Sequence, residues 1–380
     1  MATAGRATGA TPAPTEAATA LREATFVRIL TRRDGDAIAA AGVLARMLTA
    51  AGIPFQVAPT ASRAQRARRV SEGDPDATTV AIGPVDRADV TIAGPTATRT
   101  AVEIVQAAGG DPPSALALAG LTAAGTPPDD DTLREIAEGL TRRPGVGLPV
   151  ADLTAGLAFT LWLHAGFSGD PDAVASHLER VDAADDPTRL DPDSHRRVAS
   201  LVAVLGTNTP TPQRAAETID TLVRPTVLSG PFPTVEGYAE VLDAVAREHP
   251  GTAVAIALGG DAVDSARTSW RQHAEAAHAA IEAADTERYG GLYAACVPDH
   301  RVLTVARVLH RSVSPEPVTL VLGEERAALV GDPEADLRAV TTAIAETVSG
   351  SSDGTQHYGV IDHDGTAADR TLVTTAREEL

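Results

Sequence analysis

Short apolar runs alternate with longer amphipathic segments through the first third of the chain. Residues 25–31 (TFVRILT) have the apolar character of a buried strand, and residues 37–50 (AIAAAGVLARMLTA) have the pattern of a helix that stops at Gly52. Further strands are predicted at 54–59, 79–82 and 90–92, with a helix at 98–108. Strands that alternate with helices predict an α/β layer built on a largely parallel sheet.

A second α/β pattern follows a mainly helical stretch at 114–223. The Pro/Gly-rich segment LSGPFP (228–233) marks a candidate boundary between the two. Beyond it, helices are predicted at 235–248, 262–284 and 302–310, and strands at 252–258, 292–297, 318–322 and 327–330. The polar stretch 349–365 is predicted to be a loop. We therefore expect a disordered tail over 1–20, an α/β domain with a helical extension over 21–228, and a smaller α/β domain over 229–380.

Composition says more about the environment in which the protein works than about the reaction or ligand it serves. The chain has 380 residues and a formal net charge of -19, and every basic residue other than histidine is arginine. Acid excess without lysine indicates a protein hydrated in concentrated salt, a GC-rich genome, or both. An acidic surface repels nucleic acid at low salt, but about 1 M salt screens charges beyond roughly 3 Å, so a DNA-related role is neither excluded nor supported.

Cysteine content and apolar segments predict a cytoplasmic protein. The single cysteine, Cys296, excludes an internal disulfide and is interpreted as a buried strand residue. Residues 1–16 lack the apolar core of a signal peptide. Residues 150–167 form the longest apolar region, which contains Asp152 and His164 and is too short and polar for a membrane span. We expect a buried helix there and no membrane association.

The most informative stretch is TRRDGDAIAAAGVLARML (31–48), because Asp34 and Asp36 fall where the first strand ends and its helix begins. In open α/β sheets, ligands gather at the carboxyl ends of the strands. Two carboxylates on one turn can face the same Mn²⁺ or Mg²⁺ ion. The alternative is structural: Asp36 directly precedes the helix as its N-cap, and Asp34 interacts favourably with the helix dipole.

The longer string resembles the first motif of the DHH phosphoesterase superfamily. Two downstream segments, PFPTVEGYAEVLDAVAREHPG (231–251) and VLHRSVSPEPVTLVLG (308–323), resemble the DHH-associated half of archaeal RecJ-like proteins. The resemblance extends in outline over 26–380. It implies an α/β fold with an N-terminal DHH-type parallel-sheet domain, which carries the helical extension, and a smaller C-terminal DHH-associated domain.

By this resemblance, active members hold two metal ions, usually Mn²⁺, with ligands from several strands. Most of the implied ligand positions are lost here. Thr31 stands where a histidine often occurs, and Gly83 or Pro84 stands where an aspartate is expected, with Asp86 and Asp89 slightly further on. The Asp-His-His triplet is replaced by residues 93–95 (AGP), and 116–125 offers no aspartate. Asp34 and Asp36 are thus a vestigial or single-ion site, and no cofactor is expected beyond Mn or Mg with any residual activity.

Three functions follow from the resemblance. The first is a catalytically degenerate scaffold in DNA replication or repair, associated with GINS and the MCM helicase and in contact with single-stranded DNA. The second is a Mn-dependent single-strand exonuclease of 5'-3' polarity acting on DNA or RNA. The third is a phosphoesterase for small nucleotides.

Four basic residues are candidates for contact with nucleic acid or a partner. Arg63, Arg66 and Arg69 recur at helical spacing in an otherwise acidic chain. The alternative is an exposed helix face paired with acids such as Glu72 and Asp74. His357, in SSDGTQHYG, stands near the position of a substrate-contacting Gly-Gly-His-like loop in active relatives. The trio at 362–364 (DHD) is interpreted as a solvated turn.

Overall fold

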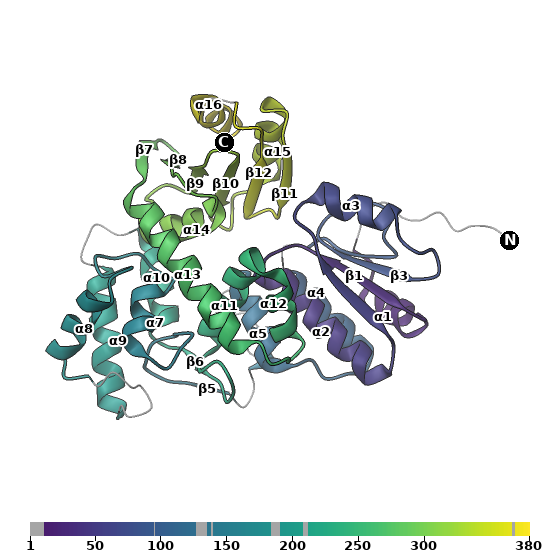
Figure 1. Cartoon of the computed structure of the whole chain (residues 1–380), viewed down its shortest axis with the longest axis horizontal. Coiled ribbons are helices and arrows are strands. Elements are labelled where there is room, and N and C mark those ends of the chain that lie inside the picture. Colours follow the sequence, from purple (N-terminus) through teal and green to yellow (C-terminus); the bar gives the residue numbers. More distant parts are fainter. Residues whose placement is uncertain are drawn as a thin grey trace. The chain divides into compact units, whose positions relative to one another are not determined.

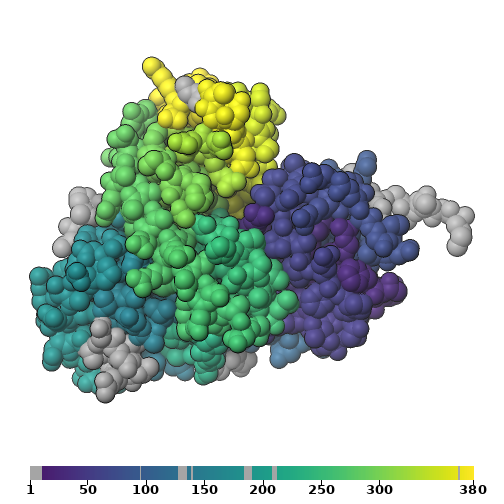
Figure 2. Space-filling view, viewed as in Figure 1, coloured from purple at the N-terminus to yellow at the C-terminus, as the bar shows by residue number. Residues whose placement is uncertain are grey.

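The computed structural model describes residues 11–94, 96–126, 135–137, 140–183, 191–207, 212–366 and 369–380. The chain divides into two compact units, each made of two stretches of sequence. Figures 1 and 2 show the course of the chain, coloured by residue number. The first unit contains 1–139 and 241–269, and the second contains 140–240 and 270–380. The chain passes between the units within helices α11 (Val235–Glu248) and α13 (Val263–Glu282). The domain boundary at 228 stays a prediction.

The first unit is built on a four-stranded, wholly parallel sheet of order β2-β1-β3-β4. Its strands are β1 (Val27–Thr31), β2 (Phe55–Pro59), β3 (Thr78–Ile82) and β4 (Val90–Ile92). The central strand β1 pairs with a neighbour on both sides and buries Ile29 and Leu30 completely or nearly so. The predicted parallel α/β layer is confirmed.

Helix α2 (Gly35–Ala51) is buried along most of its length because most of its residues are small or apolar. It packs against α4 (Ala97–Ala107) and α5 (Ser114–Ala123). The backbones approach so closely that a Cβ built on Gly120 of α5 would lie 2.4 Å from Cβ of Ala39. The unit is completed by α1 (Pro14–Arg22), α3 (Arg63–Ser71) and α12 (Pro250–Ala257).

The second unit combines a helical part with a six-stranded mixed sheet of order β11-β12-β10-β9-β8-β7. Only β8 and β9 are parallel neighbours in that sheet. The strands are β7 (Asp285–Tyr289), β8 (Leu292–Cys296), β9 (Val318–Leu322), β10 (Arg326–Gly331), β11 (Ser351–Gly354) and β12 (Tyr358–Asp362). The predicted C-terminal α/β domain is confirmed by this sheet and its helices.

Helices pack on this sheet and also make up much of the rest of the second unit. Those next to it in sequence are α14 (Val302–Ser312), α15 (Leu337–Thr347) and α16 (Asp369–Glu379). The earlier helices are α7 (Leu153–Phe159), α8 (Pro171–Arg180), α9 (Pro192–Gly206) and α10 (Gln213–Leu222). A short two-stranded antiparallel sheet pairs β5 (Thr141–Arg142) with β6 (Thr226–Val227).

Four local predictions are wrong. Residues 252–258, predicted as a strand, lie mostly in helix α12, because Pro250 starts a helix and a short apolar run fits a buried helix as well as a strand. The predicted tail 1–20 includes part of α1, which buries Leu21; residues 1–10 lie outside the described part. Residues 150–167 are helical only over α7. The stretch 349–365 contains the hairpin β11–β12.

Two further expectations concern the burial of Cys296 and the presence of a membrane span. Cys296 lies in a strand as predicted, but it is only half-buried, at the end of β8. Within the described residues, no helix is both long and apolar enough to cross a bilayer.

Candidate functional site

Asp34 and Asp36 lie at the carboxyl end of β1, where the chain turns into α2. Asp34 has an extended backbone and its Oδ1 accepts a hydrogen bond from Ala37 N at 2.9 Å, so Asp34 is the N-cap of α2. The structure thus corrects the capping hypothesis, which assigned that role to Asp36. Asp36 is already inside the first turn, one residue after the helix begins at Gly35.

Asp36 caps a different helix. Its two carboxylate oxygens accept hydrogen bonds from Ala97 N at 2.7 Å and Thr98 N at 2.8 Å, the first amides of α4. The ordinary N-cap of α4, Thr96, makes no side-chain capping bond. Asp36 therefore satisfies amides that α4 leaves open, and it joins α2 to α4.

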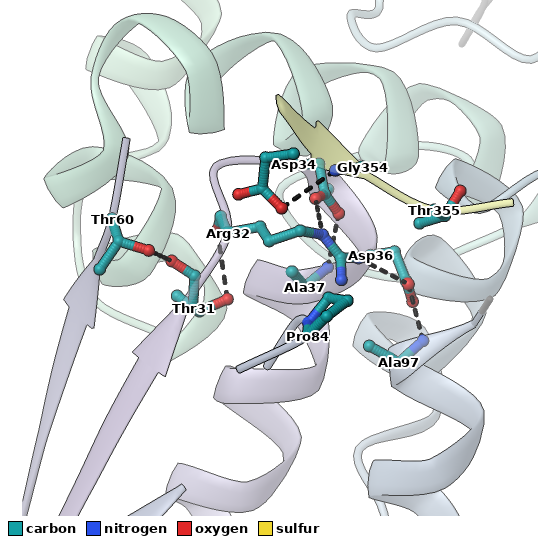
Figure 3. A network of polar contacts seen from close by, with 12 residues as sticks. Thr31, Arg32, Asp34, Asp36, Ala37, Thr60, Pro84, Ala97, Gly354 and Thr355 are labelled. Atoms are coloured by element: carbon teal, nitrogen blue, oxygen red, sulfur yellow. Dashed lines mark hydrogen bonds and ion pairs between the residues drawn. The ribbon is translucent and has the colours of Figure 1, made fainter. Parts of the chain in front are cut away.

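A guanidinium group completes this cluster. Arg32 Nε donates to Asp34 Oδ2 at 2.8 Å, and Arg32 Nη2 lies 3.8 Å from Asp36 Oδ2 (Figure 3). All three residues are 4% exposed. At an effective dielectric of about 20, a unit charge about 4 Å from a divalent ion changes its energy by roughly 8 kcal/mol, so Arg32 cancels the attraction of one aspartate.

The same contacts shift the pKa values of the two aspartates in opposite directions. Burial raises the pKa of Asp34, but the charge of Arg32 and the bonds from Arg32 and Ala37 outweigh it and hold the pKa below its usual range. Burial and the negative charge of Asp34 raise the pKa of Asp36 to about 6. Asp34 is therefore a firmly ionised partner of Arg32.

A third carboxylate comes from α11. Asp243 Oδ1 accepts a hydrogen bond from Gly35 N at 2.9 Å, and both oxygens of Asp243 contact Arg247 Nη2, at 2.9 and 2.8 Å. Asp243 thus caps α2 from another element. The segment 231–251 carried the family resemblance, but nothing in it indicated this contact.

The end of β3 offers no ligand to the cluster. Gly83, at the position of an expected aspartate, has φ +117, and a Cβ there would lie 2.9 Å from Arg66 Cζ and 3.0 Å from Arg32 Cγ. Asp89 Oδ2 accepts from Thr79 N at 2.8 Å, at the opposite end of β3 from Asp34. Asp86 is exposed. Neither aspartate replaces the missing ligand.

The residues present do not fit a two-metal centre. Each of the four carboxylate oxygens of Asp34 and Asp36 already has a donor or cation: Ala37 N, Arg32 Nε, Ala97 N and Thr98 N. In the described part of the chain, no three His, Cys, Asp or Glu side chains gather in a way that could hold a metal ion. Of the implied triplet positions, Ala93 and Gly94 are described and Pro95 lies outside the described residues.

The basic candidates do not form one surface. Arg66 is fully buried; it donates to Pro84 O at 3.3 Å and contacts Thr60 Oγ1 at 3.4 Å, so it cannot contact nucleic acid or a partner and its assignment is corrected. The reason is geometric, because this side of α3 faces the sheet. Arg63 is exposed and Arg69 is half-buried. The neighbouring Arg68 forms an exposed ion pair with Glu72.

His357 lies in the second unit, in the turn between β11 and β12. Its ring Nε2 is 2.9 Å from Gln356 Nε2, and burial lowers the pKa of the imidazole. Asp362, at the end of β12, pairs with Arg326 on the neighbouring strand β10, and Asp364 accepts from Thr366, as expected for a strand end that is followed by a turn. His357 thus belongs to the second unit, whereas Asp34 and Asp36 belong to the first.

Sequence reasoning missed Arg32, Asp243 and Arg247. Arg32 had a visible signal, since it precedes Asp34 by two positions and Asp36 by four in TRRDGD. For Asp243 and Arg247 the only signal was their spacing of one helical turn on α11.

Comparison with solved structures defines the class of fold. The chain is similar to CDC45 from Entamoeba histolytica, with a TM-score of 0.59 and 8% identity over 95% of this chain and 96% of that one. It also matches RecJ in complex with Mn²⁺ from Thermus thermophilus, with a TM-score of 0.49 and 13% identity over 99% of this chain and 56% of that one. The first similarity shows that the chain shares the fold of that CDC45, and it shows the fold alone.

Sequence comparison gives the family. The chain is 44% identical over 363 residues to "Uncharacterized protein rrnAC1427" from Haloarcula marismortui, covering 93% of this chain and 94% of that protein. A family model described as the C-terminal domain of rrnAC1427 matches residues 284–378. The protein belongs to the rrnAC1427 family.

Proposed function

We propose that this protein is a catalytically degenerate, RecJ-like DHH-fold protein that acts as a scaffold in DNA replication or repair. The observation that carries the proposal is the state of the dyad: all four oxygens of Asp34 and Asp36 are engaged by amides or by Arg32. Carboxylates engaged in this way hold helices together and are poor ligands for a metal that activates water.

The replication part of the proposal rests on resemblance. The fold is shared with CDC45 along nearly the whole length of both chains. By the family resemblance, RecJ-like proteins with a lost site accompany GINS and the MCM helicase, and single-stranded DNA is a further candidate ligand. We place the protein in the cytoplasm of a halophilic organism, in keeping with its net charge of -19 and its relative from Haloarcula.

Neither enzymatic alternative has a specific observation in its favour. A Mn-dependent exonuclease of RecJ type needs ligands that the dyad lacks, as does a small-nucleotide phosphoesterase. The buried Arg32 would have to leave before Asp34 could bind an ion. We therefore propose no cofactor for the protein.

Affinity purification tests the partner assignment. The full chain, tagged and expressed at native level, is recovered from cells of its source organism in high-salt buffer, because low salt would perturb so acidic a protein. The proposal expects GINS and MCM subunits to co-purify, and to be absent from a parallel purification of an equally tagged, unrelated acidic protein. Recovery of neither assembly would contradict the replication role.

A further inference from the structure

The aspartate cluster of the first unit contains its own counter-charges. Asp34, Asp36 and Asp243 bring three carboxylates to the start of α2, and Arg32 and Arg247 contact them directly. Buried carboxylates without positive partners would repel one another and stay protonated. The low pKa of Asp34 accords with a guanidinium that is a fixed part of the fold.

Arg32 has the position that a cation shared by the dyad would take. Its Nε and Nη2 atoms are directed at Oδ2 of Asp34 and Oδ2 of Asp36, at 2.8 and 3.8 Å (Figure 3). Because the three side chains are nearly inaccessible to solvent, a hydrated divalent ion has no room beside them. Arg32 and a divalent ion therefore cannot occupy this position at the same time.

The residue that follows β3 supplies the space for this arginine. Gly83 follows β3, and a Cβ on it would press on Arg32 Cγ at 3.0 Å and on the Arg66 guanidinium at 2.9 Å. Arg66 is itself buried and bonded to Pro84 O, beside that glycine. A side chain at position 83 would therefore compete for space with the Arg32 stem and with the Arg66 guanidinium group.

We propose that Arg32 is a built-in cation that replaces a divalent metal ion between Asp34 and Asp36, and that the absence of a side chain at Gly83 leaves room for it. The site is permanently filled, because Arg32 occupies Oδ2 of Asp34 and lies 3.8 Å from Oδ2 of Asp36. This inference deepens the loss of catalysis in the proposed function and rests on that part only; it does not depend on GINS or MCM.

Manganese binding to three purified full-length proteins tests the proposal. The loss of the free-ion signal in electron paramagnetic resonance is followed as Mn²⁺ is added to wild type, Arg32→Ala and Arg33→Ala. Arg33 is the matched control, since it is the adjacent, exposed arginine and its removal changes the net charge equally. We expect no saturable binding below about 1 mM for wild type and Arg33→Ala, and at least about tenfold tighter binding for Arg32→Ala.

A fourth protein locates the ion. Adding Asp34→Asn to Arg32→Ala should abolish the gained binding; if the double variant still binds Mn²⁺, the ion lies elsewhere and the proposal is wrong. If neither wild type nor Arg32→Ala binds, the built-in cation is overturned while the proposed function stands. If wild type binds as tightly as Arg32→Ala, both are overturned.

Folding of the variant is checked by its circular dichroism spectrum. Where Arg32→Ala does not fold, Arg32→Gln is used, because it is neutral and keeps a hydrogen-bonding end. Where neither variant folds, thermal melts of the wild-type protein test the proposal. The proposal expects the same Tm in EDTA and in Mn²⁺, and a Tm raised by Mn²⁺ and restored by EDTA would overturn it.

Discussion

Thr98 donates two hydrogen bonds to Asp36. Thr98 N donates to Asp36 Oδ1 at 2.8 Å, and Thr98 Oγ1 donates to Asp36 O at 2.9 Å. The pair joins the first turn of α2 to the first turn of α4, and both residues are buried. A residue that resembles a metal ligand in sequence is thus a joint between two helices.

Replacing Asp36 with alanine should cost about 2–3 kcal/mol of unfolding free energy, because two buried amides lose their acceptor and Arg32 loses a partner. Asp170→Ala is the control. Asp170 also caps two amides, of Asp172 and Ala173 in α8, but it is exposed, so its loss should cost about 1 kcal/mol. Urea melts measure both variants. Equal losses would mean that Asp36 is not a buried joint.

Gly83 should tolerate no side chain. Gly83→Ala combines an unfavourable positive φ with contact against Arg32 and Arg66, and we expect a loss of about 3 kcal/mol or more. Gly52→Ala isolates the backbone effect, since Gly52 has φ +70 and nothing within 4 Å of an added Cβ; it should cost about 1 kcal/mol. Thermal melts that show the same Tm for the two variants would refute the crowding at Gly83.

Glu240 should make stability fall as pH rises. It is buried in the second unit and accepts from Thr160 Oγ1, Leu161 N and Trp270 Nε1, yet burial raises its pKa to about 7. The folded state therefore holds a proton that the unfolded state has lost above about pH 4.5. Its contribution is complete below pH 4.5 and is lost through pH 7, for a total of about 3 kcal/mol.

Glu240→Gln should remove that part of the pH dependence. Tm is measured from pH 5 to pH 8 in wild type, in Glu240→Gln and in Glu72→Gln, whose carboxylate is exposed. Burial also raises the pKa of Glu236 to about 7, and Glu236 therefore adds the same pH dependence of Tm to every variant. The quantity compared is the difference in Tm between each variant and wild type at each pH. A Glu240→Gln curve parallel to that of wild type would contradict the assignment.

Salt should stabilise the whole protein. A net charge of -19 destabilises the compact state through repulsion, and screening shortens from about 10 Å at 0.1 M to about 3 Å at 1 M salt. We expect Tm to rise with KCl up to molar concentrations. A Tm that peaks near 0.1 M KCl would show that the acidic surface does not adapt the protein to salt.

The sequence predicted the parts of the fold that depend on local pattern. The parallel sheet of the first unit and the position of Asp34 and Asp36 at its carboxyl end followed from alternating strands and helices. Helix α12 was missed because a short apolar run between punctuating residues has no periodicity that separates a buried helix from a strand.

The contacts of the site residues depend on tertiary packing and could not be predicted from local sequence pattern. Helical spacing placed Arg66 on an expected exposed face, but only the packing of α3 on the sheet buries it. Asp36 and Ala97 are 61 positions apart, and Gly35 and Asp243 are 208 apart. Such pairings are decided by how close the folded backbones come.

The central claim, that the dyad of Asp34 and Asp36 no longer supports metal-dependent nuclease chemistry, is tested most directly by a cleavage assay. End-labelled single-stranded DNA and RNA, and a short dinucleotide, are incubated with Mn²⁺ and either wild type or the Asp34→Ala, Asp36→Ala double variant. The structure predicts no product from wild type above the level of the double variant. Turnover by wild type that the double variant lacks would contradict the account.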